Sequence, residues 1–84
     1  MREAVGDAVE VCVDLHTRLD LPEALLVCRE IESARPYFVE DPLRCENPGS
    51  FRSLRPRTAS PLAAGEHFSS KWEFRELVEE ELID

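Results

Sequence analysis

Short runs of β-branched and aromatic residues, in which apolar and polar positions alternate, predict three strands in this chain. The first run extends from Val9 to Leu15 and the third from Pro61 to Glu66. The second begins at Tyr37 and is expected to stop at Pro42, because proline has no N–H to donate to a sheet ladder. Each strand is thus predicted to be short and to end in a polar loop.

Apolar residues at helical spacing predict a helix after the first strand, over about residues 22–33. Pro22 suits the first helical position, and Leu21 stands where a capping serine or threonine would be usual. Pro36 then enforces an exit from the helix before the second strand. The buried stripe of this helix is expected to be Ala24, Leu25, Cys28 and Ile31.

A second helix is predicted to begin at Pro48, after Asn47 as its cap, and to bury Phe51 and Leu54. Pro56 is expected to end this helix early or to bend its last turn, because a proline inside a helix removes a hydrogen bond. The second helix is therefore the least regular of the set.

A third helix is predicted after Ser70, because Ser70 and Glu73 match a capping box. Its buried stripe is expected to be Phe74, Leu77, Val78 and Leu82. At the other end of the chain, residues 2–5 are predicted to form one helical turn that Gly6 terminates.

Strand, helix, strand, helix, strand and helix in succession predict an α/β fold with a parallel sheet and right-handed crossovers. A parallel sheet needs cover on both faces. Three units cannot close a barrel, because a (β/α)8 barrel takes eight units and roughly 250 residues. We therefore expect residues 1–84 to form three consecutive βα units of a (β/α)8 TIM barrel, with parallel strands and an incomplete barrel.

Composition narrows the classes of protein that this chain can be. Its 84 residues make one small domain, and its hydrophobic fraction of 43% and charged fraction of 33% are typical of a soluble globular protein. The net charge of −8 repels phosphate backbones and argues against nucleic acid as a partner. No apolar run reaches the length of a membrane span, and no apolar segment follows Met1 as it would in a signal peptide.

The three cysteines, Cys12, Cys28 and Cys45, lie far apart and show no metal-binding spacing. This usage indicates a reducing compartment, so we expect a cytoplasmic location. A free cysteine commonly packs as a small apolar residue. All three are therefore expected to serve structural packing.

Three acids, Asp14, Glu40 and Glu66, stand at the ends of the predicted strands, and each is 26 residues from the next. The carboxyl ends of parallel strands meet at one edge of a sheet, where barrel enzymes carry their active sites. Because adjacent strands are about 4.8 Å apart, the three carboxylates can converge on one cation that offsets their repulsion. All-oxygen ligation favours Mg²⁺, with Mn²⁺ as an alternative. The other interpretation of each acid is a cap or a salt-bridge partner.

His16 lies two residues beyond Asp14 and, by strand alternation, on the same face. It is expected to overhang the predicted metal site, where an imidazole can give a proton to a leaving hydroxyl or take one up. The other interpretation of His16 is a loop histidine with an ordinary hydrogen bond. His67 follows Glu66 directly, so we expect it to point to the opposite face or to lie in the loop, in a structural role.

Three motifs, taken together at these spacings, resemble the enolase superfamily. Within it the chain is most similar to the mandelate racemase and muconate lactonizing enzyme branch, and there to sugar-acid dehydratases that act on galactonate or mannonate. The resemblance covers essentially the whole chain, as a partial C-terminal barrel domain with the third to fifth strands and their helices. The motifs are Asp14-Leu15-His16, Phe38-Val39-Glu40-Asp41-Pro42-Leu43 with Glu46-Asn47-Pro48, and Pro61-Leu62-Ala63-Ala64-Gly65-Glu66.

The resemblance implies a magnesium ion held by Asp14, Glu40 and Glu66. In this superfamily, which is a standard example of the chemistry, the metal binds the substrate carboxylate and stabilises the enediolate formed when the α-proton is removed. Loss of the β-hydroxyl as water then gives a 2-keto-3-deoxy sugar acid. His16 matches the family's general acid for this step, which favours a dehydratase over a racemase or cycloisomerase.

Several parts of the family's enzymes are expected to be absent from these residues: the capping domain, the second barrel strand, and the sixth to eighth strands, which include the usual carriers of the general base. We therefore expect no turnover by this chain alone. Two alternatives stay open. One is a non-catalytic part that completes a barrel with another chain or with copies of itself through exposed strand edges, and the other is a truncated gene product. A racemase or cycloisomerase ancestry also stays open, because the deciding base residues lie outside this sequence.

Overall fold

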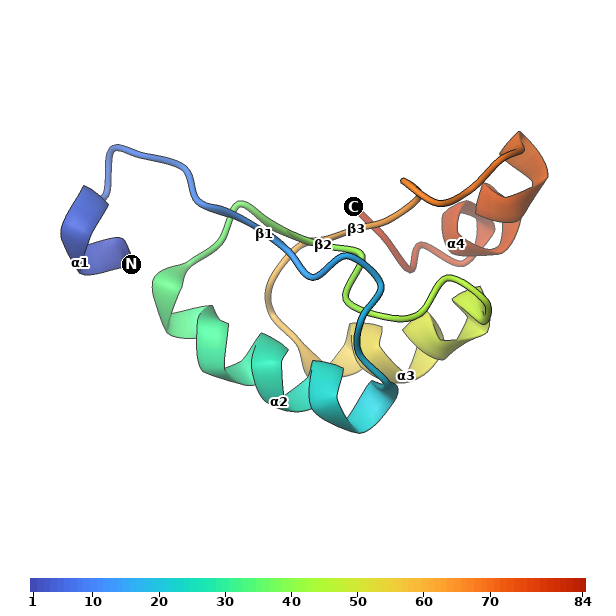
Figure 1. The fold of residues 1–84 in the computed structure, drawn as a ribbon, viewed down its shortest axis with the longest axis horizontal. Helices are drawn as coiled ribbons and strands as arrows, with labels where there is room; N and C mark the ends of the chain where they lie inside the picture. The colour runs from blue at the N-terminus through green and yellow to red at the C-terminus, as the bar shows by residue number, and fades with distance from the viewer.

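The computed structural model describes all residues 1–84 and has an α/β fold with one three-stranded parallel sheet (Figure 1). The strands are β1 (Cys12–Asp14), β2 (Phe38–Glu40) and β3 (Leu62–Ala63), in the spatial order β1-β2-β3. The prediction of three parallel strands in an open sheet is confirmed, although each strand is shorter than its hydrophobic run. The helices are α1 (Arg2–Val5), α2 (Leu21–Ile31), α3 (Phe51–Leu54) and α4 (Arg75–Glu79).

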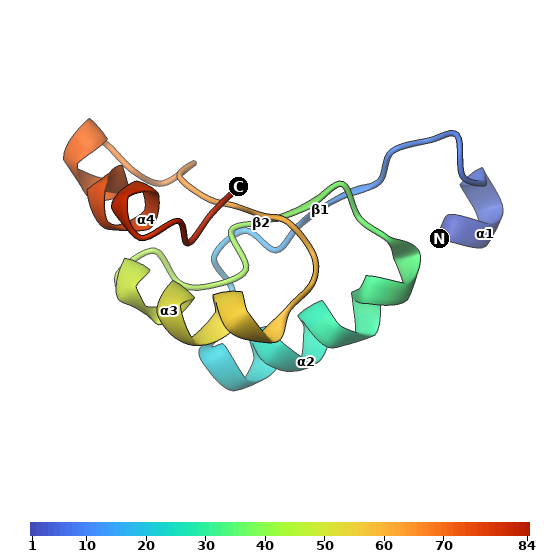
Figure 2. The same ribbon diagram turned by 180° about the vertical axis from the view of Figure 1, so that it is seen from behind.

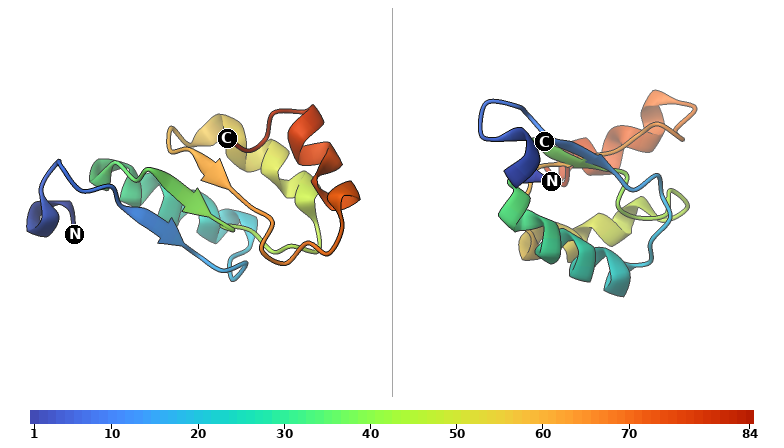
Figure 3. Two further views of the ribbon diagram at one scale, coloured as in Figure 1. Left: turned by 90° about the horizontal axis from the view of Figure 1, so that it is seen from above. Right: turned by 60° about the vertical axis from the view of Figure 1, so that its left-hand side comes forward.

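Helices α2 and α3 lie side by side under the same face of the sheet, and no helix lies over the opposite face (Figures 1 and 2). The strands run in one direction above these two helices, with α4 beyond β3 (Figure 3). The buried core lies between the sheet and the helices. It consists of Ala24, Cys28, Val39, Leu43, Phe51, Leu54, Leu62, Leu77 and Leu82.

Helix α2 begins one residue earlier than predicted. Its N-cap is Asp20, so Leu21 is the first helical residue and not the cap. The backbone N–H of Asp20 donates to the Glu23 carboxylate at 3.0 Å, which satisfies a donor at this helix terminus. Of its predicted stripe the helix buries Ala24 and Cys28, while Leu25 and Ile31 are only partly buried against the core. It continues as a 3₁₀ turn over Glu32–Ala34.

Helix α3 is short, as the proline in its sequence predicts. A 3₁₀ turn over Pro48–Ser50 leads into it, and another over Arg55–Arg57, which contains Pro56, ends it. Phe51 and Leu54 are both buried in the core, as expected from their spacing.

Helix α4 is shorter than its hydrophobic pattern predicts. A 3₁₀ turn over Lys71–Phe74 precedes it, and the Ser70 backbone N–H donates to the Glu73 carboxylate at 2.8 Å, as the capping box predicts. Leu77 is buried, but Val78, its neighbour in the helix, is 61% exposed, contrary to the predicted stripe. Leu82 is buried from beyond the helix end.

The three cysteines differ in how far they are exposed to solvent. Cys28 is buried in α2 as expected, and Cys45 is half-buried. Cys12 is exposed, which contradicts its predicted role in packing. In the register Cys12 pairs with Phe38, while the buried Val39 faces the helices, so alternation places Cys12 on the uncovered face.

None of the helices combines the length and hydrophobicity that a bilayer crossing demands.

Candidate metal centre

Asp14 and Glu40 are neighbours because β1 and β2 pair in parallel with these two residues opposite each other. Backbone hydrogen bonds extend the pairing past the strand ends. The Leu15 N–H donates to the Glu40 carbonyl at 3.0 Å, and the Thr17 N–H donates to the Asp41 carbonyl at 2.8 Å. The two acids therefore leave the sheet together at its carboxyl edge, as the sequence predicts.

Glu66 reaches the same edge by a different route from the predicted one. We expected it to end the third strand, but β3 stops at Ala63 and Glu66 lies in the following turn. Gly65 takes a φ of +125°, which side chains rarely allow and which turns the chain out of the ladder. The equal sequence spacing of the acids therefore does not reflect equivalent strand positions.

Asp41 joins the two segments on which Glu40 and Glu66 lie. Its N–H donates to the Ala63 carbonyl at 2.8 Å, and its Oδ1 accepts the Gly65 N–H at 3.1 Å. Asp41 is 4% exposed, and its other oxygen, Oδ2, has no hydrogen-bond partner. The residue has a φ of +44°, a conformation that aspartate tolerates better than most residues. This buried carboxylate thus holds the turn that carries Glu66 against the end of β2.

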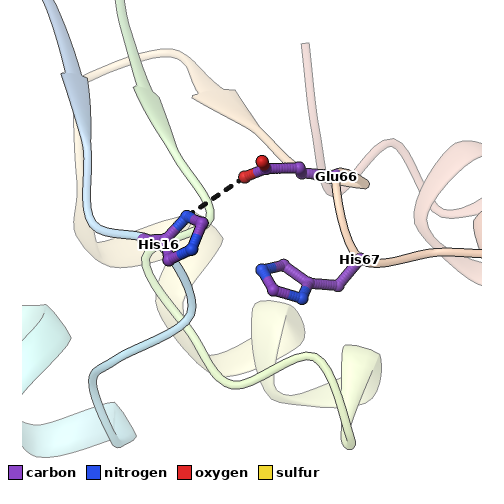
Figure 4. Close-up of side chains that lie close together, drawn as sticks. All are labelled: His16, Glu66 and His67. Atoms are coloured by element: carbon purple, nitrogen blue, oxygen red, sulfur yellow. Dashed lines mark ion pairs between the residues drawn. The ribbon is translucent and has the colours of Figure 1, made fainter.

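His16 also lies in a turn and not in the strand. Its φ is +52°, and its N–H donates to Asp14 Oδ1 at 2.7 Å, so strand alternation does not place its ring, contrary to our prediction. Its Nδ1 nevertheless lies 3.1 Å from Glu66 Oε2 (Figure 4). The same atom is 3.8 Å from Asp14 Oδ2. The ring therefore stands between two of the predicted metal ligands, by way of the turn after β1.

The structure brings some of the acids closer together than others. Ligand oxygens of Glu40, Asp41 and Glu66 all lie within 4.8 Å of one another. Asp14 belongs to no such group, although it is the register partner of Glu40 and a neighbour of His16. The assignment of Asp14, Glu40 and Glu66 as metal ligands, with His16 as the acid beside them, stays a prediction.

Negative charge accumulates at Glu40. Partial burial raises the pKa of its carboxyl, and the charges of Asp14, Asp41 and Glu66 raise it further, while His16 lowers it. Repulsion among close carboxylates has this effect because each charge disfavours ionisation of the others. A cation placed among them would remove that cost.

The sequence did not predict the contacts that Asp41 and His67 make in this region. The sequence indicated Asp41 only as part of a turn. The pattern that could have singled it out is an aspartate between a strand and a proline, because aspartate tolerates a positive φ. His67 was expected on the opposite face from Glu66 or in the loop. It lies in the turn, and its ring centroid is 5.0 Å from that of His16.

The residues present fit a hard divalent cation. Carboxylate oxygens are the donors that such ions prefer, and here three carboxylates lie within reach of one ion. The unpartnered Asp41 Oδ2 is a buried acceptor that a cation, or a water bound to one, would satisfy. The side chains of Asp14 and Glu66 are 49% and 52% exposed, so this edge of the sheet is open to solvent.

Comparison with known proteins gives the family of this chain. The family model described as enolase C-terminal domain-like matches residues 1–84. The chain is 43% identical over 83 residues to D-mannonate dehydratase Caul1427 of Caulobacter sp. (strain K31), covering 99% of this chain and 21% of that protein. It is 40% identical over 79 residues to the D-galactonate dehydratase of Klebsiella pneumoniae (strain 342), covering 94% of this chain and 21% of that protein.

The fold likewise matches a crystal structure of an enolase from Pantoea ananatis with bound D-gluconate and Mg, at a TM-score of 0.91 and 32% identity. That match covers 99% of this chain and 20% of the other. The chain thus spans about a fifth of the length of the relatives it matches. The full-length family match, together with these relatives, shows that the chain belongs to the enolase superfamily, in its enolase C-terminal domain-like family.

Proposed function

We propose that this chain is part of a magnesium-dependent sugar-acid dehydratase, and that it supplies the third to fifth strand-helix units of that enzyme's barrel. The observation that carries the proposal is the convergence of carboxylates at the carboxyl edge of the sheet, with Glu40, Asp41 and Glu66 within 4.8 Å of one another. The relatives named as mannonate and galactonate dehydratases support the substrate class, an aldonate with hydroxyls beside its carboxylate.

Asp14, Glu40 and Glu66 would hold the ion in this proposal, and the buried Asp41 would add negative charge behind Glu40. When bound, Mg²⁺ (or Mn²⁺) would neutralise the substrate carboxylate and the charge that develops as the α-proton leaves. The protein's own contribution is to keep three repelling acids at one edge. It does so through the β1–β2 register and through the Asp41–Gly65 hydrogen bond.

His16 is proposed as the general acid for loss of the β-hydroxyl. Its Nδ1 faces Glu66 Oε2 at 3.1 Å, which leaves Nε2 as the nitrogen that can meet a substrate hydroxyl. A proton donated there would let the hydroxyl leave as water and give a 2-keto-3-deoxy acid. The Asp14–His16 hydrogen bond holds the turn, so the imidazole stays beside the acids before substrate arrives.

The proposed reaction needs groups beyond these residues. A general base for the α-proton is required, and the open strand edge requires further protein to enclose a substrate. We therefore expect this chain, incubated with Mg²⁺ and a panel of aldonates, to form no 2-keto acid. Clear product formation would contradict the proposal that the reaction needs groups beyond these residues. Membership of a racemase or cycloisomerase remains the alternative within the same superfamily, since the deciding base is not among these residues.

Magnesium binding by the chain itself tests the metal assignment. In isothermal titration calorimetry we expect saturable binding of one Mg²⁺, with Mn²⁺ as a comparison ion. At a free concentration of 100 times Kd this binding should stabilise the fold by about 2.7 kcal/mol. Glu40→Gln should abolish binding, whereas Glu30→Gln, which removes an exposed acid of α2, should leave it unchanged. A chain that is folded by circular dichroism yet binds no Mg²⁺ would contradict the assignment.

The second candidate function is a non-catalytic part that completes a barrel with another chain or with copies of itself. The uncovered face of the sheet favours it, because parallel sheets are normally covered on both faces (Figure 1). Light scattering after size-exclusion chromatography separates the cases. A defined oligomer supports assembly through the sheet, and a monomer argues against self-association.

A cytoplasmic location stays a prediction from the cysteine usage.

A further inference from the structure

We propose that His16, Glu66 and His67 form a second cation site, specific for a transition-metal ion of the zinc class. The site overlaps the proposed magnesium site through the Glu66 carboxylate. Neither the family resemblance nor the relatives' names assign it, and His67 has no part in the function proposed above. The three side chains come from the turn after β1 and the turn after β3 (Figure 4).

The distances are close to those of a zinc centre. One ligand atom from each of the three residues lies within 4.8 Å of the other two. In a tetrahedral site with bonds of about 2.1 Å, neighbouring ligand atoms are roughly 3.4 Å apart. His16 Nδ1 and Glu66 Oε2 are already 3.1 Å apart. The His67 nitrogen therefore has to approach by at most about 1.4 Å, the difference between 4.8 Å and that tetrahedral spacing.

The donor set determines the class of cation. Two imidazoles and one carboxylate form the ligand set of many zinc enzymes, with a fourth position left for water. Imidazole nitrogen suits Zn²⁺, Cu²⁺ and Ni²⁺, whereas Mg²⁺ prefers oxygen alone. The chain thus offers two overlapping sets of ligands, the carboxylates of the proposed magnesium site and this nitrogen-containing set.

The site is accessible and poised for binding. The side chains of His16 and Glu66 are 46% and 52% exposed, and His67 is also exposed, so an ion can enter without opening the fold. The two imidazole rings already meet edge to face at a centroid distance of 5.0 Å.

Zinc binding in this position has a consequence for the proposed activity. An ion that takes His16 Nδ1 and a Glu66 oxygen removes the proposed general acid and one proposed magnesium ligand together. Zn²⁺ should therefore weaken Mg²⁺ binding and inhibit a complete enzyme. This competition rests on the proposed function; the zinc site itself does not.

The test uses the full 84-residue chain with Cys12→Ser and Cys45→Ser, because thiols that are not fully buried also bind zinc. Zn²⁺ affinity is measured by competition with a chromophoric chelator. His67→Gln should weaken Zn²⁺ binding at least tenfold and leave Mg²⁺ affinity unchanged. Glu66→Gln should weaken both. Glu30→Gln, in α2, is the matched control and should change neither.

Nuclear magnetic resonance provides the direct assignment, because the chain has only 2 histidines. Zn²⁺ should shift the ring nitrogen signals of both, and Mg²⁺ should not shift those of His67. Equal Zn²⁺ affinity of the parent and His67→Gln, or a folded chain without saturable Zn²⁺ binding, would overturn the proposal. Zn²⁺ binding without any Mg²⁺ binding would support this site and contradict the proposed function.

Discussion

Substitution of Gly65 by alanine should destabilise the fold through two separate effects. The first is backbone strain, because Gly65 has a φ of +125° and a side chain there costs about 1–3 kcal/mol. The second is a collision, because an added Cβ would overlap the Cε1 and Cζ atoms of the Phe74 ring. That ring cannot move freely, since it packs edge to face on Phe68 at a centroid distance of 4.8 Å. Overpacking of this kind costs typically 1–3 kcal/mol.

The expected loss from Gly65→Ala is therefore about 2–6 kcal/mol in the free energy of unfolding. A domain of this length has a total stability of about 4–13 kcal/mol, so the loss is a large fraction of it. Urea denaturation followed by circular dichroism gives the midpoint and the slope, and hence the free-energy change. The slope should stay constant if the variant still unfolds in two states.

Two further variants separate strain from collision. Leucine at position 74 lacks the clashing ring atoms, and the Phe74 Cδ1 atom is at an ordinary 3.6 Å from the added Cβ. In a Phe74→Leu background, Gly65→Ala should therefore cost only the strain term of about 1–3 kcal/mol. Gly6→Ala adds a comparison, because Gly6 has a φ of +74° and no atom within 4 Å of the added Cβ. A Gly65→Ala loss below about 0.5 kcal/mol, or an equal loss in both backgrounds, would refute the reasoning.

Two more predictions concern the core and the cap of the 3₁₀ turn that precedes α4. Leu54→Ala, at a side chain that is 0% exposed, should cost about 2–5 kcal/mol in urea denaturation. Leu26→Ala, at a side chain that is 64% exposed, should stay within about 0.5 kcal/mol of the parent, and similar losses at both sites would contradict the placement of the core. Hydrogen bonds from the backbone N–H groups of Ser69 and Ser70 lower the pKa of the Glu73 carboxyl in the folded chain. Ionised Glu73 therefore stabilises the fold at pH values above the ordinary pKa of a glutamate. This stabilisation is lost as the pH falls through the lowered pKa of the folded state. The stability difference between the parent and Glu73→Gln should therefore shrink as pH falls from about 5 towards 2, and a difference independent of pH would argue against the cap.

The arrangement of elements could be predicted from the sequence because it depends on local patterns. Apolar alternation, helical spacing and the proline stops act within a few residues, so they indicate where strands and helices form. The order of those elements then dictates parallel pairing. Pro56 illustrates the point, since its effect on α3 needs no information from elsewhere in the chain. Hydrophobic runs overestimate strand length because they do not show where the hydrogen-bond ladder stops.

The positions of the chemical groups in the loops depended on long-range contacts. The sequence by itself placed Asp14 and Glu40 at neighbouring strand ends, because the register of a parallel pair follows from the pattern of its two strands. Glu66 and His16 reach the same edge through turns with positive φ, and the buried Asp41 holds the Glu66 turn from another segment. No local pattern contains those hydrogen bonds, because they join residues that only folding brings together. The meeting of His67 with His16 was likewise decided by the tertiary structure alone, for the same reason.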